Sequence, residues 1–228
     1  MPLSPLPPPP LLLRAVLFDL DGTLVRTFID FARMRNEMRA ISARVDTEAA
    51  TAGEDDVLGI VARMSATLGD PAGAAVRREA YDCLEALERE GCAHAHPVAG
   101  ARELLAVLRG EKRVSVAVIT RNCRSVALDL VRRFDLAHDL LVAREDTARF
   151  KPDPDPLLRA LNEFGVAPEN AVMIGDLWPD IAAGRAAGVA LTVGIQWPHD
   201  PPGRFARCPP DVTVASLEEA ARLLLGAA

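Results

Sequence analysis

The sequence predicts an α/β protein built on a doubly wound parallel β-sheet, with a helical module inserted into it. Three observations predict this fold. Short apolar runs without alternation recur along residues 11–20 and 114–215, as expected of strands that are buried on both faces. Helical patterns lie between successive runs, as in βαβ units. Residues 28–94, by contrast, contain no convincing strand and carry apolar residues at helical spacing.

The predicted strands are the apolar runs that end in polar residues or glycine. The first is LLLRAVLFDL, residues 11–20. The others, several of them rich in β-branched residues, are VSVAVIT (114–120), DLLVA (139–143), AVMIGD (171–176), ALTVGI (190–195) and VTVA (212–215). Helices are predicted over residues 100–109, 124–134, 154–164, 180–187 and 216–225.

The interruption after the first strand defines the predicted domains. Residues 11–27 and 95–228 form the α/β core, and residues 28–94 form a helical cap, as in the amphipathic segment YDCLEALERE. Residues 1–10 form a proline-rich, flexible leader. Because the chain leaves the core and returns to it at two nearby points, we expect the insert to move as a lid.

Composition excludes several classes of function. The 228 residues carry a formal net charge of −6, which argues against a nucleic-acid partner. No stretch approaches the roughly 20 apolar residues of a membrane span. The four cysteines show no metal-binding spacing and indicate reduced thiols, so a cytoplasmic protein is expected. Both a monomer and a homodimer are compatible with the sequence.

Chemically useful side chains follow four of the predicted strands or loops. In an open parallel sheet, ligands bind beyond the carboxyl ends of the strands, so these side chains are expected to converge. They are Asp19 and Asp21 after the first strand, Thr120, Arg121 and Asn122 after the second, Lys151 in FKPDPDPLL, and Asp176 with Asp180 after the fourth.

The residue types at this edge favour phosphoryl chemistry. Oxygen ligands without a His or Cys cluster favour Mg²⁺. A cation, a lysine, a hydroxyl and backbone N–H groups, here those of Leu20 and Gly22, form a cradle for a phosphoryl group. One carboxylate can attack phosphorus, and a second can protonate the leaving oxygen and then activate water. Gly22 suits the sharp turn that lets the backbone approach a phosphate.

Four motifs together resemble those of the haloacid dehalogenase-like (HAD) superfamily. They are DLDGTLV, VIT followed by RN, FKPDPDPL and IGDLWPDIAAGRAAGV, in the family's order. The resemblance covers residues 14–215 and is closest to phosphoglycolate phosphatase-like members. It implies a Rossmann-like core, a small helical cap that selects the substrate, and a Mg²⁺-dependent phosphatase acting on a small phosphorylated metabolite.

The resemblance also implies a role for each matching residue. Asp19 would be the nucleophile that forms an aspartyl-phosphate, and Asp21 the general acid and base. Asp19 and Asp176 would bind Mg²⁺ through their side chains, and Asp21 through its backbone carbonyl. By the same resemblance, Thr120 and Lys151 would bind the phosphoryl group. Asp180 would steady either a metal-bound water or Lys151.

Two features separate this sequence from other branches of the superfamily. Members that cleave carbon–halogen bonds lack the second aspartate, which is present here as Asp21. Phosphonoacetaldehyde-type hydrolases need a cap lysine, and the insert contains none. Arg121 stands where many relatives have an asparagine, and Asn122 comes one place later, so either side chain is a candidate substrate contact.

Alternatives remain at this stage. A sugar phosphomutase of the same superfamily would return the phosphoryl group to a second hydroxyl. A non-enzymatic receiver domain also combines acidic residues, Thr and Lys, but is about half as long and lacks a helical insert. His94 and His96 are expected at a hinge surface rather than at a metal, and Trp178 either walls the site or packs. The insert and its entry carry five arginines that either bind an anionic substrate or form a solvated face: Arg26, Arg33, Arg35, Arg39 and Arg44.

Overall fold

A computed structural model describes residues 12–201 and 203–226, so the predicted leader at residues 1–10 lies outside the described residues. The chain divides into two compact units. One comprises the described residues up to Arg26 together with those from His96 onward, and the other is Thr27–Ala95. Within the described part of the chain, no helix is long and apolar enough to cross a membrane.

The first unit is built on a six-stranded parallel sheet, which confirms the predicted α/β class. The strand order β5-β4-β1-β6-β7-β8 places the first strand in the middle, as in a doubly wound fold. The strands are β1 (Ala15–Phe18), β4 (Ser115–Ile119), β5 (Leu140–Val142), β6 (Ala171–Gly175), β7 (Leu191–Ile195) and β8 (Val212–Val214). The first strand is shorter than the predicted range 11–20; Leu12, before it, is 64% exposed.

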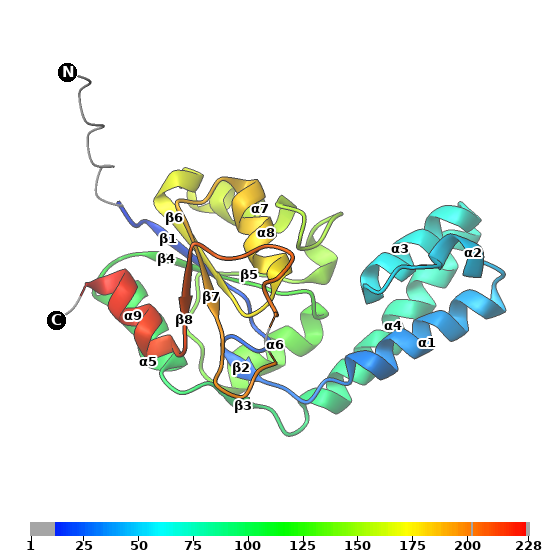
Figure 1. The fold of residues 1–228 in the computed structure, drawn as a ribbon, viewed down its shortest axis with the longest axis horizontal. Helices are drawn as coiled ribbons and strands as arrows, with labels where there is room; N and C mark the ends of the chain where they lie inside the picture. Colours follow the sequence, from blue (N-terminus) through cyan, green and yellow to red (C-terminus); the bar gives the residue numbers. More distant parts are fainter. Residues whose placement is uncertain (1–11, 202, 227–228) are drawn as a thin grey trace, which may run out of the picture. The chain divides into compact units, whose positions relative to one another are not determined.

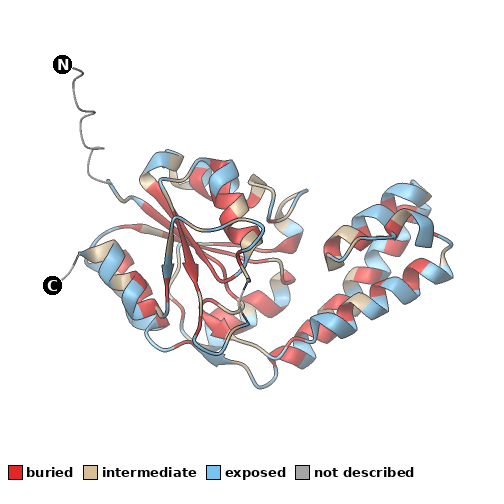
Figure 2. Ribbon diagram, in the orientation of Figure 1, coloured by how far each residue is buried: buried red, intermediate tan, exposed pale blue. Residues whose placement is uncertain are grey.

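Helices cover both faces of this sheet. Helices α7 and α8 pack together on one side, whereas α5 and α9 contact each other on the other side (Figure 1). The helices of this unit are α5 (Ala101–Gly110), α6 (Arg124–Arg133), α7 (Asp155–Phe164), α8 (Trp178–Ala187) and α9 (Leu217–Leu225), with short 3₁₀ turns at Arg144–Asp146 and Pro168–Asn170. Figure 2 shows the central strands almost wholly buried, which explains their continuous apolar sequences.

Strand register brings three loops to one edge of the sheet. Phe18 of β1 lies opposite Val118 of β4 on one side and opposite Ile174 of β6 on the other. Because all three strands run in the same direction, the residues that follow them emerge together. The sheet therefore gathers the loops that begin at Asp19, Thr120 and Asp176.

A two-stranded antiparallel ribbon marks the ends of the insertion. It pairs β2 (Val25–Arg26) with β3 (His96–Pro97), and Arg26 lies opposite His96. The sequence reading missed this ribbon because two residues are too few to show a strand pattern. Both connections to the second unit begin directly beyond it.

The second unit is entirely helical, as its sequence predicts. It contains α1 (Phe31–Arg44), α2 (Glu48–Thr51), α3 (Val57–Leu68) and α4 (Ala72–Cys92). Asp30 and Asp56 cap α1 and α3, since their carboxylates accept hydrogen bonds from Arg33 N and Gly59 N. The apolar faces of the helices form a small core of their own that includes Met34, Met38, Ile60, Met64, Ala80 and Leu84.

Candidate active site

The loop after β1 carries the first two predicted acids. Asp19 still follows the strand geometry, since its N–H donates to Ile174 O at 2.9 Å. The chain then turns so sharply that Gly22 N donates to Val25 O, and Gly22 adopts a φ of +81°. The carbonyl of Leu20 accepts hydrogen bonds from two later N–H groups of the same loop. Asp19 is buried, whereas Asp21 is only partly so.

The loop after β6 supplies two more carboxylates. Asp176 is 1% exposed and Asp180 is 3% exposed. Leu177 N donates to Asp180 Oδ2 at 3.1 Å, which holds this side chain at the first turn of α8. A Cβ atom at Gly175 would lie 2.3 Å from the Cβ of Asp180, so only glycine allows this close approach.

The ammonium group of Lys151 joins these loops. Its Nζ lies 2.6 Å from Asp19 Oδ1 and 2.7 Å from Asp180 Oδ1. It also donates to the carbonyl of Ile119, at the end of β4, at 2.7 Å. The side chain is only 2% exposed, so all three acceptors satisfy a fully buried cation. Lys151 thus connects the ends of β1, β4 and β6.

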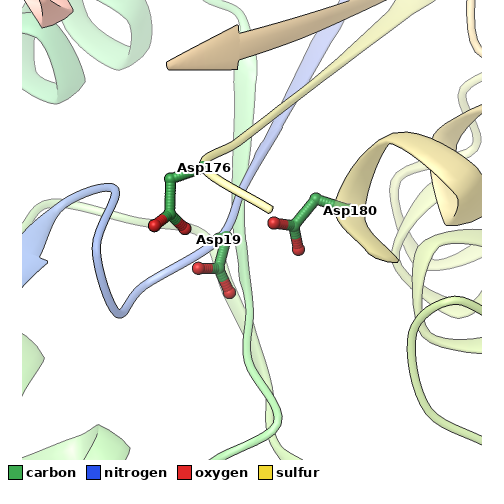
Figure 3. Close-up of side chains that lie close together, drawn as sticks. All are labelled: Asp19, Asp176 and Asp180. Atoms are coloured by element: carbon green, nitrogen blue, oxygen red, sulfur yellow. The ribbon is translucent and has the colours of Figure 1, made fainter. Parts of the chain in front are cut away.

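Three carboxylates face one another at this point (Figure 3). One ligand oxygen from each of Asp19, Asp176 and Asp180 lies within 4.8 Å of the others, close enough to share a metal ion. The donors are all hard oxygen atoms, which matches the preference of a divalent cation such as Mg²⁺ or Ca²⁺. This group includes the side chain of Asp180, which the sequence predicted to lie beside the metal ligands rather than among them. It does not include the side chain of Asp21, which was predicted to contribute only its backbone carbonyl.

Burial and mutual repulsion disfavour the ionised forms of the carboxylates in this cluster. Burial raises the pKa of Asp19 to about 7; the charges of Asp180 and Asp21 act in the same direction, and Lys151 opposes them. Burial, followed by the charges of Asp19 and Asp180, also raises the pKa of Asp176 well above its ordinary value. Burial alone would lower the pKa of Lys151, but Asp180 and Asp19 outweigh it and raise this pKa. A bound divalent cation would offset the remaining repulsion.

The end of β4 contributes a hydroxyl and an amide. Thr120 is 6% exposed, and its Oγ1 accepts a hydrogen bond from Asn122 N at 3.1 Å. Asn122 is also buried, and its side-chain Nδ2 has no hydrogen-bond partner within residues 12–201 and 203–226. Arg121 is more exposed than either neighbour. Asn122 Nδ2 is therefore a buried donor that a substrate oxygen could satisfy.

Two residues contact Asp176 that the sequence did not identify as site residues. Thr23 Oγ1 lies 3.5 Å from Asp176 Oδ1, and Arg204 Nη2 lies 2.5 Å from Asp176 Oδ2. Thr23 belongs to the DLDGT motif, so its place in the motif offered a signal. Arg204 lies in the irregular segment between β7 and β8, where no sequence pattern identified it.

Other residues considered at the sequence level lie apart from the carboxylates or pair elsewhere. In the helical unit, Arg33, Arg39 and Arg44 form exposed ion pairs with Glu90, Asp55 and Glu79, which supports the solvated-face interpretation. His94 and His96 are exposed. Trp178 begins α8, and the guanidinium of Arg207 lies 5.2 Å from the centre of its ring. Arg26 stacks on Trp197 in the core unit.

Comparison with known proteins agrees with the geometry. A family model described as haloacid dehalogenase-like hydrolase matches residues 13–188. The chain is 33% identical over 205 residues to an N-acetylmuramic acid 6-phosphate phosphatase of Pseudomonas aeruginosa, covering 85% of this chain and 88% of the other. It is 32% identical over 222 residues to a phosphoglycolate phosphatase of Cupriavidus necator, covering 92% of each.

Solved structures show the same fold. A hydrolase from Pseudomonas syringae superposes with a TM-score of 0.64 at 20% identity, over 94% of this chain and 100% of that one.

Proposed function

The chain belongs to the haloacid dehalogenase-like hydrolase family, and from this membership we propose that it is a divalent-cation-dependent phosphatase of a small phosphorylated metabolite. The observation that carries the proposal is the meeting of Asp19, Asp176 and Lys151 at one edge of the sheet, from three separate loops. Receiver domains, the non-enzymatic alternative, do not share this family or the helical insertion.

Asp19 is proposed as the nucleophile. Lys151 holds Oδ1 of its carboxylate at 2.6 Å, so we assign attack on phosphorus to Oδ2. The new Oδ2–phosphorus bond forms as the ester oxygen–phosphorus bond breaks, which leaves a phosphoryl group on Asp19. The positive charge of Lys151 also neutralises negative charge that develops on the phosphoryl oxygens.

Asp21 is proposed as the proton donor and acceptor. It lies two residues after the nucleophile and is less buried, so it can exchange protons with solvent. It gives its proton to the leaving oxygen in the first step. In the second step it takes a proton from the water that attacks phosphorus, and Asp19 is released together with inorganic phosphate.

We propose that Asp19 and Asp176 hold Mg²⁺, with the backbone carbonyl of Asp21 as a third ligand and Asp180 steadying Lys151. When bound, the cation supplies charge stabilisation for the phosphoryl group. Support comes from the all-oxygen donor set and from the repulsion that raises the pKa of Asp19 and Asp176. The backbone N–H of Leu20, with Thr120, Asn122 and Arg121, is proposed to bind the phosphorylated substrate. The N–H of Gly22, expected in the same role, already donates to Val25 O, so Gly22 contributes the turn instead.

The helical unit is proposed as the cap that selects the substrate. Support comes from its own apolar core and from its two connections, which both start at the β2–β3 ribbon. We propose that the protein works in the cytoplasm as a monomer or homodimer. The sequence supports this location, because the four cysteines are few for 228 residues and show no paired metal spacing.

The test is release of inorganic phosphate from p-nitrophenyl phosphate. We expect activity with Mg²⁺, loss of activity in EDTA, and loss in Asp19→Asn. Activity that survives Asp19→Asn would contradict the assignment of the nucleophile. A panel with 2-phosphoglycolate, N-acetylmuramic acid 6-phosphate, pyrophosphate and hexose phosphates then defines the substrate. Isomerised hexose phosphate without free phosphate would indicate a phosphomutase instead.

A further inference from the structure

Arg204 lies between two buried carboxylates beside the proposed cation site. Its Nη2 is 2.5 Å from Asp176 Oδ2, and its Nη1 is 2.6 Å from Asp200 Oδ2. The side chain of Arg204 is 18% exposed, and those of the two aspartates are 2% and 6% exposed. This is a largely desolvated ion-pair network, in which the loss of one member is costly to the others.

The segment that carries Arg204 is attached to the nucleophile loop. Trp197 Nε1 donates to the carbonyl of Gly22 at 2.8 Å, and the guanidinium of Arg26 lies 4.5 Å from the centre of the Trp197 ring. The backbone N–H of Trp197 also donates to Asp200 Oδ2, the atom that Arg204 contacts. Trp197, Asp200 and Arg204 therefore join Gly22 to Asp176 through linked contacts.

The charges of the site fall into two groups. Lys151 pairs with Asp19 and with Asp180, whereas Arg204 pairs with Asp176. A divalent cation on Asp176 would bring two further positive charges next to the guanidinium. In a site that excludes water, such repulsion is much stronger than at an exposed surface.

We propose that Arg204 competes with the divalent cation for Asp176, and that it thereby sets the cation affinity of the site and couples cation binding to residues 197–204. This inference rests on the cation site of the proposed function. When the cation binds, the guanidinium leaves Oδ2 of Asp176, and the contacts of the segment with the nucleophile loop weaken.

The experiment is a calorimetric titration of Mg²⁺ into the cation-free protein, comparing wild type with Arg204→Gln. We expect the dissociation constant for Mg²⁺ to fall roughly tenfold in Arg204→Gln, since the competing charge is gone. Arg207→Gln is the matched control, because Arg207 also lies between β7 and β8, is exposed and faces Trp178. Its dissociation constant should stay within about twofold of wild type.

A second readout does not depend on affinity or on activity. Hydrogen exchange of the backbone amides of Trp197 and Asp200, which donate to Asp200 Oδ2 and to the carbonyl of Trp197, should speed up in wild type when Mg²⁺ is added. In Arg204→Gln the exchange should be fast already and should not respond to Mg²⁺. If Arg204→Gln does not fold, Arg204→Lys replaces it, because lysine keeps the charge but cannot contact Asp176 and Asp200 together. Its dissociation constant for Mg²⁺ should lie between that of wild type and the roughly tenfold lower value predicted for Arg204→Gln.

The outcomes separate this inference from the proposed function. Wild type that binds Mg²⁺, with unchanged or weaker binding in Arg204→Gln, would overturn the competition but leave the phosphatase and its cation site intact. Unchanged exchange of the Trp197 and Asp200 amides on Mg²⁺ binding would overturn the coupling. Wild type and Arg204→Gln that both fail to bind Mg²⁺, while wild type releases phosphate in EDTA, would overturn the cation site itself.

Discussion

Lys151 Nζ lies 2.6 Å from Asp19 Oδ1, although 132 residues separate the two along the chain. The same ammonium group contacts Asp180 and the carbonyl of Ile119. A buried lysine with three acceptors is costly to desolvate and is retained only where its charge is balanced. The proposed phosphoryl chemistry gives this charge a role in addition to its structural one.

Replacement of this lysine should therefore affect folding and activity together. Lys151→Met leaves Asp19 and Asp180 buried without their cation, and we expect a loss of about 3–5 kcal/mol in the free energy of unfolding. Urea denaturation monitored by circular dichroism measures it. The matched control is Lys112→Met, since Lys112 is the other lysine of the chain and is exposed. Equal stability of the two variants would show that the buried ion pairs contribute nothing.

Asp19→Asn should abolish phosphate release yet stabilise the cation-free protein. In wild type, the pKa of the Asp19 carboxyl is raised from 3.8 to about 7. Between these two pH values the folded state keeps a proton that the unfolded state loses. Wild-type stability therefore falls as pH rises from about 4 to about 7, and the asparagine variant avoids this loss. The free energy of unfolding of both proteins, measured by urea denaturation in EDTA at pH 5 and pH 8, tests the direction of this difference. A variant that is less stable than wild type at pH 8 would refute it.

Gly22→Ala should disrupt the site more than the turn conformation alone explains. Gly22 has a φ of +81°, and a Cβ there would lie 2.2 Å from Asp176 Oδ2. Gly53 has a φ of +73° with no atom within 4 Å, so Gly53→Ala carries the backbone strain without the clash. We expect Gly53→Ala to lose roughly 1–2 kcal/mol of stability, and Gly22→Ala to lose more because of the clash. Only Gly22→Ala should also lose Mg²⁺ affinity in calorimetry; equal affinities would argue against the contact.

Asp139 should contribute stability that disappears in acid. Burial alone would raise its pKa, but hydrogen bonds from Arg109 and Val116 N outweigh burial and lower the pKa below 3.8. Its contribution is therefore complete above about pH 4 and is lost as pH falls through the lowered pKa. Asp139→Asn should cost about 1 kcal/mol at pH 7, discounted for partial exposure, and progressively less as pH falls toward 2.

The control for this comparison is Asp82→Asn, which alters an exposed aspartate on α4. Its free energy of unfolding should match that of wild type at both pH values. A pH-independent cost in Asp139→Asn would show that the variant disturbs packing rather than removing a charge.

The sheet and its helices were predictable because each strand is a continuous apolar run and each helix an amphipathic segment. The edge that gathers Asp19, Thr120, Lys151 and Asp176 follows from parallel topology alone. The two-residue strands of the β2–β3 ribbon were missed because they are too short to show a period. The side-chain packing of Asp180 among the carboxylates depends on the close approach at Gly175, which is a three-dimensional property.

Arg204 illustrates the limit of sequence reasoning most clearly. It belongs to an irregular segment of residues 196–211, where neither hydrophobic period nor motif indicates which way a side chain points. Arg204 pairs with Asp200 four residues before it, and Trp197 donates to the carbonyl of Gly22 on the nucleophile loop. Such long-range pairing leaves no local pattern, so only the folded structure identifies this arginine.

The most direct test of the account is the site of covalent phosphorylation during turnover. The protein is mixed with Mg²⁺ and p-nitrophenyl phosphate, quenched with acid within milliseconds, and digested for peptide mass spectrometry. We predict a phosphoryl group on Asp19 that forms and decays at rates compatible with turnover. Phosphate release with no phosphorylated Asp19 at any time, or with the label on another residue, would contradict the central claim.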